Sequence, residues 1–73
     1  GSWAQRDVWE RMLIHAAIND QQHSLARALL AERTNMAPTS APSWIMYAEA
    51  LNSCGEPKEA ETARTKATEI LAA

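Results

Sequence analysis

The sequence is poor in the residues that interrupt helices and in those that form covalent or metal links. Its 73 residues contain two glycines, three prolines and one cysteine, and no phenylalanine. A single cysteine excludes an intramolecular disulfide, and Cys54 matches none of the paired spacings by which zinc is held. A chain this short buries only about 60% of the surface that its unfolded form exposes. We therefore expect one small domain of marginal stability, held together by helix packing.

Charge of one sign and long apolar runs are also lacking. Seven basic and nine acidic residues are intermixed, giving a net charge of -2, so no single-sign field exists to attract a phosphate backbone. No apolar run approaches the roughly 18 residues that span a bilayer, and the start of the chain has no signal-peptide pattern. We expect this module to make no nucleic acid contact and no membrane insertion.

Residues arranged for catalysis or metal binding are missing as well. His15 and His23 lie on different predicted helices, and neither has a cysteine or carboxylate at ligand spacing. Cys54 is expected to be a small buried hydrophobic residue and not a nucleophile. There is no glycine-rich loop and no nucleophile-base spacing. We expect no enzymatic activity, no cofactor and no metal ion.

Apolar residues at three- and four-residue steps predict four helices in a composition rich in helix formers. The first is predicted to span residues 4–18. The second follows Asp20, which is expected to cap it, and runs to Arg33. The third begins at Pro42, with Ser40 or Ala41 as its cap.

Cys54 and Gly55 end the third predicted helix, because glycine takes the left-handed conformation without steric penalty. Pro57 then opens the fourth. Ile70 and Leu71, near its end, have no polar helix behind them, so we expect a further helix or an interface there. The side chains expected to face the core are Trp9, Met12, Leu13, Ala16, Leu25, Ala26, Leu29, Leu30, Trp44, Tyr47, Ala48, Leu51, Ala60, Ala63, Ala67, Ile70 and Leu71.

The chain aligns with itself. Trp9 falls on Trp44 at an offset of 35 residues, whereas Ala26 falls on Ala60 at an offset of 34. The difference predicts one inserted residue in the first hairpin, within residues 21–24.

The second copy, read as Trp44-x2-Tyr47-Ala48-x2-Leu51 with Gly55, Glu59-Ala60 and Ala67, resembles a tetratricopeptide repeat. Pro38 matches that family's proline between repeats. The resemblance implies an all-α fold of two antiparallel helix-turn-helix hairpins, stacked as a short superhelical fragment. Residues 3–33 and 43–73 would form the hairpins, residues 34–42 the linker, and residues 1–2 look like a cloning scar. Trp44-x2-Tyr47-Ala48-Glu49 is also similar to the half-a-tetratricopeptide repeat of RNA-processing scaffolds, although Glu61 replaces an expected arginine.

In such stacks the first helix of each hairpin lines a concave surface that binds a partner. The register of the two tryptophans assigns to this surface Glu10, Arg11, Ile14, Ile18, Ile45, Met46, Glu49 and Asn52. Its apolar members suit an amphipathic helix or an apolar peptide. They also suit cover by a neighbouring repeat or a second copy. We therefore expect a protein-interaction scaffold with a protein or peptide partner. The alternatives are self-association as a homodimer, docking within a larger chain, or an RNA-processing scaffold.

Overall fold

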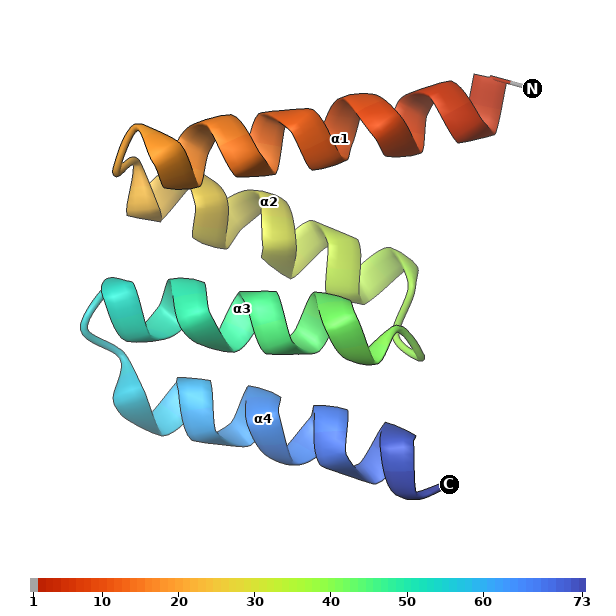
Figure 1. The fold of residues 1–73 in the computed structure, drawn as a ribbon. Helices are drawn as coiled ribbons and strands as arrows, with labels where there is room; N and C mark the ends of the chain where they lie inside the picture. Colours follow the sequence, from red (N-terminus) through yellow and green to blue (C-terminus); the bar gives the residue numbers. More distant parts are fainter. Residues whose placement is uncertain (1) are drawn as a thin grey trace.

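The computed structural model describes residues 2–73, with side chains from residue 5 onward, and consists of four helices. They are α1 (Ser2–Asn19), α2 (His23–Met36), α3 (Ala41–Ser53) and α4 (Pro57–Ala72), and no strand occurs among the described residues. Gly1 of the expected scar and the side chain of Trp3 lie outside this description. Consecutive helices run in opposite directions, which places both hairpin turns at one end of the stack (Figure 1). The predicted all-α arrangement of helical hairpins is confirmed.

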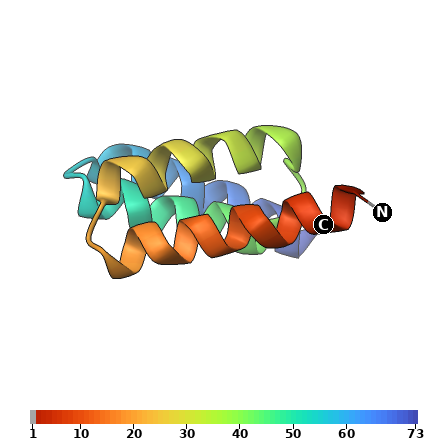
Figure 2. The ribbon, with the colours of Figure 1, turned by 90° about the horizontal axis from the view of Figure 1, so that it is seen from above.

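The stack is a thin slab in which helices contact only their neighbours along the chain. Within the described residues α1 packs on α2, α2 on α3, and α3 on α4. The slab measures 33 × 31 × 15 Å. Seen from above, α2 is displaced sideways from α1, so the four axes do not lie in one plane (Figure 2).

The connector between α2 and α3 is shorter than predicted, because α2 continues three residues past Arg33 to Met36. Thr34 is buried in this extra turn, and its hydroxyl donates a hydrogen bond of 2.9 Å to the carbonyl of Ala31. That bond satisfies the polar side chain inside the helix. Ser40 occupies the cap position of α3, as expected, and its hydroxyl lies 3.0 Å from that of Ser43.

The two hairpin turns have the same backbone form. In the second turn, Gly55 has a φ of 77° and the N–H of Glu56 donates to the carbonyl of Leu51 over 2.9 Å. In the first turn, Gln21 has a φ of 58° and the N–H of Gln22 donates to the carbonyl of Ala17 over 2.8 Å. Both are the helix ending in which a left-handed residue closes the last turn.

Every position of these turns therefore matches its counterpart at an offset of 34, and the predicted insertion in the first hairpin is wrong. The expected cap is wrong too. Asp20 closes the end of α1, with its N–H donating to the carbonyl of Ala16 over 2.9 Å, and Gln22 holds the cap position of α2 without a side-chain bond.

Burial within α1 follows the same offset. Ile14 and Ala17 are 1% and 3% exposed, and they correspond to the buried Ala48 and Leu51 of α3. The expected core residue Trp9 is 64% exposed instead. A step of one residue turns a side chain by about 100° around a helix, so aligning the two tryptophans displaced the register of all of α1. Its other expected core members Met12, Leu13 and Ala16 are exposed as well.

Two apolar clusters form the core. The first lies within the second hairpin, where the fully buried Ala48 and Ala60 let α3 and α4 approach closely, and Trp44 packs at its edge. The second joins the hairpins, because Ile14 of α1 and Leu30 of α2 cluster with Ala50 of α3. The inward residues predicted for the last three helices are buried or half-buried, except Leu25 and Leu71, which are exposed.

Candidate functional site

The offset of 34 pairs the exposed positions of α1 with those of α3. Both sets lie on the sides of the two helices that the core leaves free. In the second hairpin these positions hold Ile45, which is 43% exposed, and Glu49. Three of the corresponding exposed pairs are Arg11 with Ile45, His15 with Glu49, and Ile18 with Asn52. The first helices of the two hairpins thus present equivalent exposed rows.

A groove lies between these helices. It encloses a cavity of about 260 Å³ and has a floor that includes the buried Ile14 and the half-buried Met46. Arg11 and His15 line it from α1, and Pro42 lines it from α3. Its remaining lining residues are Arg33, Ser40 and Ser43. An apolar floor under a polar rim is the usual composition of a pocket that accepts an apolar group and orients it by a few polar contacts.

Three of the eight predicted partner-binding residues are not exposed contacts. Ile14 is 1% exposed, Met46 packs against the cluster that joins the hairpins, and the carboxylate of Glu10 lies 3.8 Å from the guanidinium of Arg33. The register displaced by one residue explains Glu10 and Ile14. The other five are exposed: Arg11, Ile18, Ile45, Glu49 and Asn52.

His15 is the residue of this surface that the sequence reasoning missed, because the displaced register put it outside the concave row. One signal could have identified it. The match of Ala26 to Ala60 already gave an offset of 34, and extending that offset into the first helix aligns His15 with Glu49.

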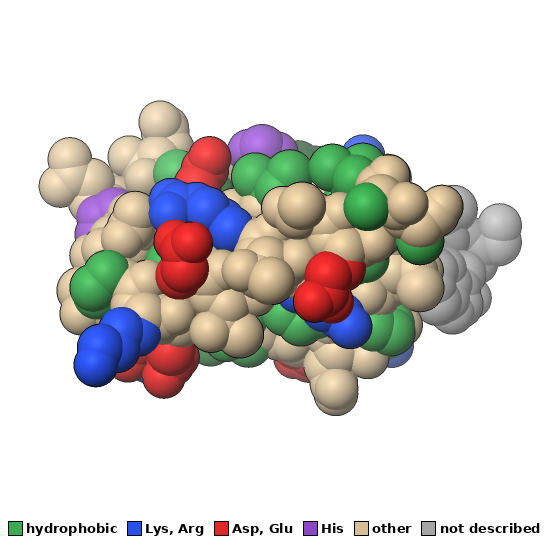
Figure 3. Space-filling model, turned by 90° about the horizontal axis from the view of Figure 1, so that it is seen from below, with side chains coloured by type: hydrophobic (Ala, Val, Ile, Leu, Met, Phe, Trp, Pro, Cys, Tyr) green, Lys and Arg blue, Asp and Glu red, His purple; other side chains and the backbone are tan. Residues whose placement is uncertain are grey.

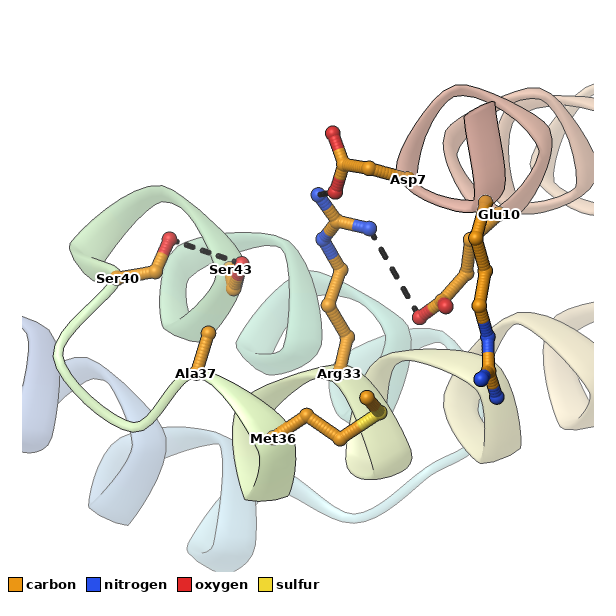
Figure 4. A pocket seen from close by; sticks show the side chains of 8 residues that line it. Asp7, Glu10, Arg33, Met36, Ala37, Ser40 and Ser43 are labelled. Carbon is orange, nitrogen blue, oxygen red and sulfur yellow. Dashed lines mark hydrogen bonds and ion pairs between the residues drawn. The ribbon is translucent and has the colours of Figure 1, made fainter. Parts of the chain in front are cut away.

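Arg33, which also lines the groove, joins α2 to α1. Its guanidinium lies between the carboxylates of Asp7, to which it is hydrogen-bonded, and Glu10 (Figure 4). Asp7 also pairs with Arg11, at 3.4 Å. The Arg33 side chain is only 16% exposed, so these ion pairs are shielded from water more than a surface pair would be. A cavity of about 100 Å³ lies beside the network, lined by Arg6, Asp7, Glu10, Arg33, Met36, Ala37, Ser40 and Ser43. The charges that wall it stabilise the contact between helices.

A different ion pair, at the opposite end of the stack from Arg33, joins the first hairpin to the second. The guanidinium of Arg27 in α2 donates a hydrogen bond of 2.9 Å to the carboxylate of Glu56, the residue that precedes α4. This hydrogen bond and the negative charge of Glu56 raise the pKa of Arg27 above its usual value. The ion pair of Arg27 with Glu56 joins the turn between α3 and α4 to α2.

The surface carries charges of both signs side by side, as the face seen in Figure 3 illustrates. No helix in residues 2–73 is long and apolar enough to cross a membrane. Across the same part of the chain, no three His, Cys, Asp or Glu side chains gather into a group that could hold a metal ion.

Comparisons with protein-family models, with curated proteins and with solved structures found no match to this chain. The site is therefore interpreted from its own geometry.

Proposed function

We propose that this chain is a protein-interaction module of the tetratricopeptide-repeat type, which binds an apolar or amphipathic peptide or helix in the groove between α1 and α3. The groove itself carries the proposal. Its apolar floor accepts one side chain of a ligand, and the exposed rows on both sides offer further apolar contacts at Ile18 and Ile45. An amphipathic helix places apolar side chains on one face at such spacings.

Three features support the repeat type. The two hairpins match at a constant offset of 34 residues. Small residues stand where the helices of the second hairpin approach each other, at Ala48 and Ala60, which are both 0% exposed. The connector is tied to the second hairpin, because the indole N–H of Trp44 donates a hydrogen bond of 2.9 Å to the carbonyl of Pro38.

The charges on the groove indicate how a ligand is oriented. Arg11 is on α1 and already pairs with Asp7, whereas Glu49 is on α3 and forms no ion pair with any described residue. A basic ligand residue beside Glu49 would gain an attraction without breaking an existing pair. We therefore expect the bound peptides to combine apolar anchors with a lysine or arginine on the side that faces α3.

A selection from a random 12-residue peptide library displayed on phage, on the immobilised chain, tests the proposal. The dissociation constant of a selected peptide is then measured by fluorescence anisotropy. The substitution Ile45→Ser removes one exposed apolar contact, which contributes about 1.5 kcal/mol to the free energy of binding. It should therefore raise the dissociation constant about tenfold. Leu71→Ser is the matched control, because Leu71 is 72% exposed on α4, away from the groove.

Two results would count against the groove. One is a selection that yields no peptide with a dissociation constant below about 100 µM, because a preformed apolar site of this kind should exceed that affinity. The other is equal weakening by both substitutions. Met46 is unsuited to this test, because it packs on the core and its loss would lower stability as well.

A further inference from the structure

The outward face of α1 is apolar, and nothing in the described structure covers it. This face lies on the side of α1 away from Ile14 and Ala17, because residues three and four positions apart return to the same side of a helix, whereas residues five apart, such as Trp9 and Ile14, point in nearly opposite directions. Its four large members are more than half exposed: Val8 at 55%, Trp9 at 64%, Met12 at 58% and Leu13 at 52%.

The outer helix at the other end of the stack differs. The outward face of α4 is polar and charged, and Leu71 is its one large hydrophobic side chain that is exposed among the described residues. The residues of that face include Glu61, Arg64, Thr65, Thr68 and Glu69. Single exposed apolar side chains are ordinary, but a contiguous group that includes a tryptophan marks a contact surface. The sequence had placed the uncovered surface on α4, whereas the structure places the larger one on α1.

The size of this face fits a small symmetric dimer. From their exposed fractions, the four residues leave about 450 Å² in water on each copy, so pairing two copies would bury at most about 900 Å², just below the ~1,000 Å² that a specific interface is expected to exceed. A dimer with an interface of this size is expected to have a dissociation constant in the micromolar range or above.

The charges around the face favour an antiparallel second copy. The face itself carries no charge. Arg6, an exposed residue that also lines the cavity beside Arg33, stands near its start, and Asp20, the exposed residue that follows α1, stands near its end, about 21 Å away along the helix direction. Neither makes an ion pair with any described residue. Antiparallel pairing brings Arg6 of each copy to Asp20 of the other, whereas parallel pairing would bring like charges together.

Side-chain sizes agree with the same arrangement. A two-fold axis between Met12 and Leu13 places Trp9 of one copy over Ala16 of the other, so a large side chain meets a small one at both ends of the contact. Arg11 and His15, which line the groove, lie along one edge of the apolar face. The two-fold axis keeps that edge on the same side in both copies, so both grooves open toward the same side.

We infer that α1 pairs antiparallel with α1 of a second copy, through Val8, Trp9, Met12 and Leu13, to form a homodimer with two adjoining grooves. This dimer does not depend on the peptide-binding proposal, since it uses a different face of α1.

Sedimentation equilibrium of the whole 73-residue chain, from 5 µM to 1 mM, tests the inference. We expect a reversible monomer-dimer equilibrium. Trp9→Glu should raise its dissociation constant at least tenfold while the helical circular dichroism stays unchanged, because Trp9 is exposed in the monomer. Leu71→Glu, which also adds a charge at an exposed apolar position, should leave the equilibrium unchanged.

A charge exchange tests the orientation. Arg6→Asp alone should weaken the dimer, and combining it with Asp20→Arg should restore it, because the reversed charges again meet as opposite pairs. A chain that stays monomeric at 1 mM would overturn the inference and leave the face to a different protein partner. A dimer that Trp9→Glu does not weaken, or that the double exchange does not restore, would overturn the proposed antiparallel contact.

Discussion

Gln21 holds a left-handed backbone conformation that costs a residue with a side chain roughly 1–2 kcal/mol. Glycine at the same position has no such cost but loses more freedom on folding, about 0.4–1 kcal/mol. Gln21→Gly should therefore raise the free energy of unfolding by up to about 1.6 kcal/mol, the largest difference between these two effects. Gly55→Ala, at the matching position of the second hairpin, should lower it by about 1 kcal/mol. A Cβ at Gly55 would meet no atom within 4 Å, so that cost arises from the backbone alone.

Thermal unfolding followed by circular dichroism at 222 nm measures both changes. For a domain of this size, 1 kcal/mol corresponds to a shift in Tm of roughly 4–8 °C, upward for Gln21→Gly and downward for Gly55→Ala. Lys66→Gly, in the exposed interior of α4, is the control, and it should lower Tm because glycine there only weakens the helix. If Gln21→Gly lowers Tm as Lys66→Gly does, the two turns do not share one conformation, and the constant offset of 34 residues is wrong.

Two further predictions concern the contacts between helices, and urea unfolding measures both. Leu30→Ala should lower the free energy of unfolding by about 2–5 kcal/mol, because Leu30 is 0% exposed in the cluster that joins the hairpins. Leu25→Ala is the control: Leu25 is 46% exposed, so its replacement should lower the free energy of unfolding by less than about 1 kcal/mol. Equal losses would contradict the observed register of α2. Arg33→Gln should lower the free energy of unfolding by about 1.5–3 kcal/mol, because Asp7 and Glu10 lose their shared partner. Arg64→Gln is the control: Arg64 belongs to an exposed ion pair at 4.0 Å, so its replacement should lower the free energy of unfolding by at most about 0.5 kcal/mol. A loss for Arg33→Gln no larger than that for Arg64→Gln would show that the network does not hold α1 in place.

The second hairpin could be predicted from sequence because its local signals agree with one another. Trp44, Ala48 and Leu51 recur in α3 at steps of four and three residues, Gly55 marks the turn, and Pro57 opens the next helix. Each signal acts over a few residues, so none depends on the rest of the fold.

The first helix could not be assigned in this way, because it is apolar on two opposite sides. Trp9 and Met12 lie on one side, Ile14 and Ala17 on the other, and periodicity alone does not decide between them. The ion pairs of Arg33 with Asp7 and Glu10 hold the side of α1 that faces α2. They join residues far apart in the sequence, so no local pattern in the first helix reveals them.

The groove could be predicted only in part. Of the residues that the sequence placed on the concave surface, Arg11, Ile14 and Met46 line the cavity of the groove. Ile45, Glu49 and Asn52 of α3 are exposed but are not among the residues that line this cavity. The first hairpin turn also lacked its usual sequence signal, because Gln21 occupies the left-handed position at which a glycine would have predicted the turn.

The most direct test of the central proposal is a map of amide chemical-shift changes in the ¹⁵N-labelled chain, titrated with the peptide obtained from the library selection. Binding in the groove predicts that the largest changes fall on the exposed rows of α1 and α3, around Arg11, His15, Ile18, Ile45, Glu49 and Asn52. Changes confined to α4, or to the outward face of α1 around Trp9, would contradict it.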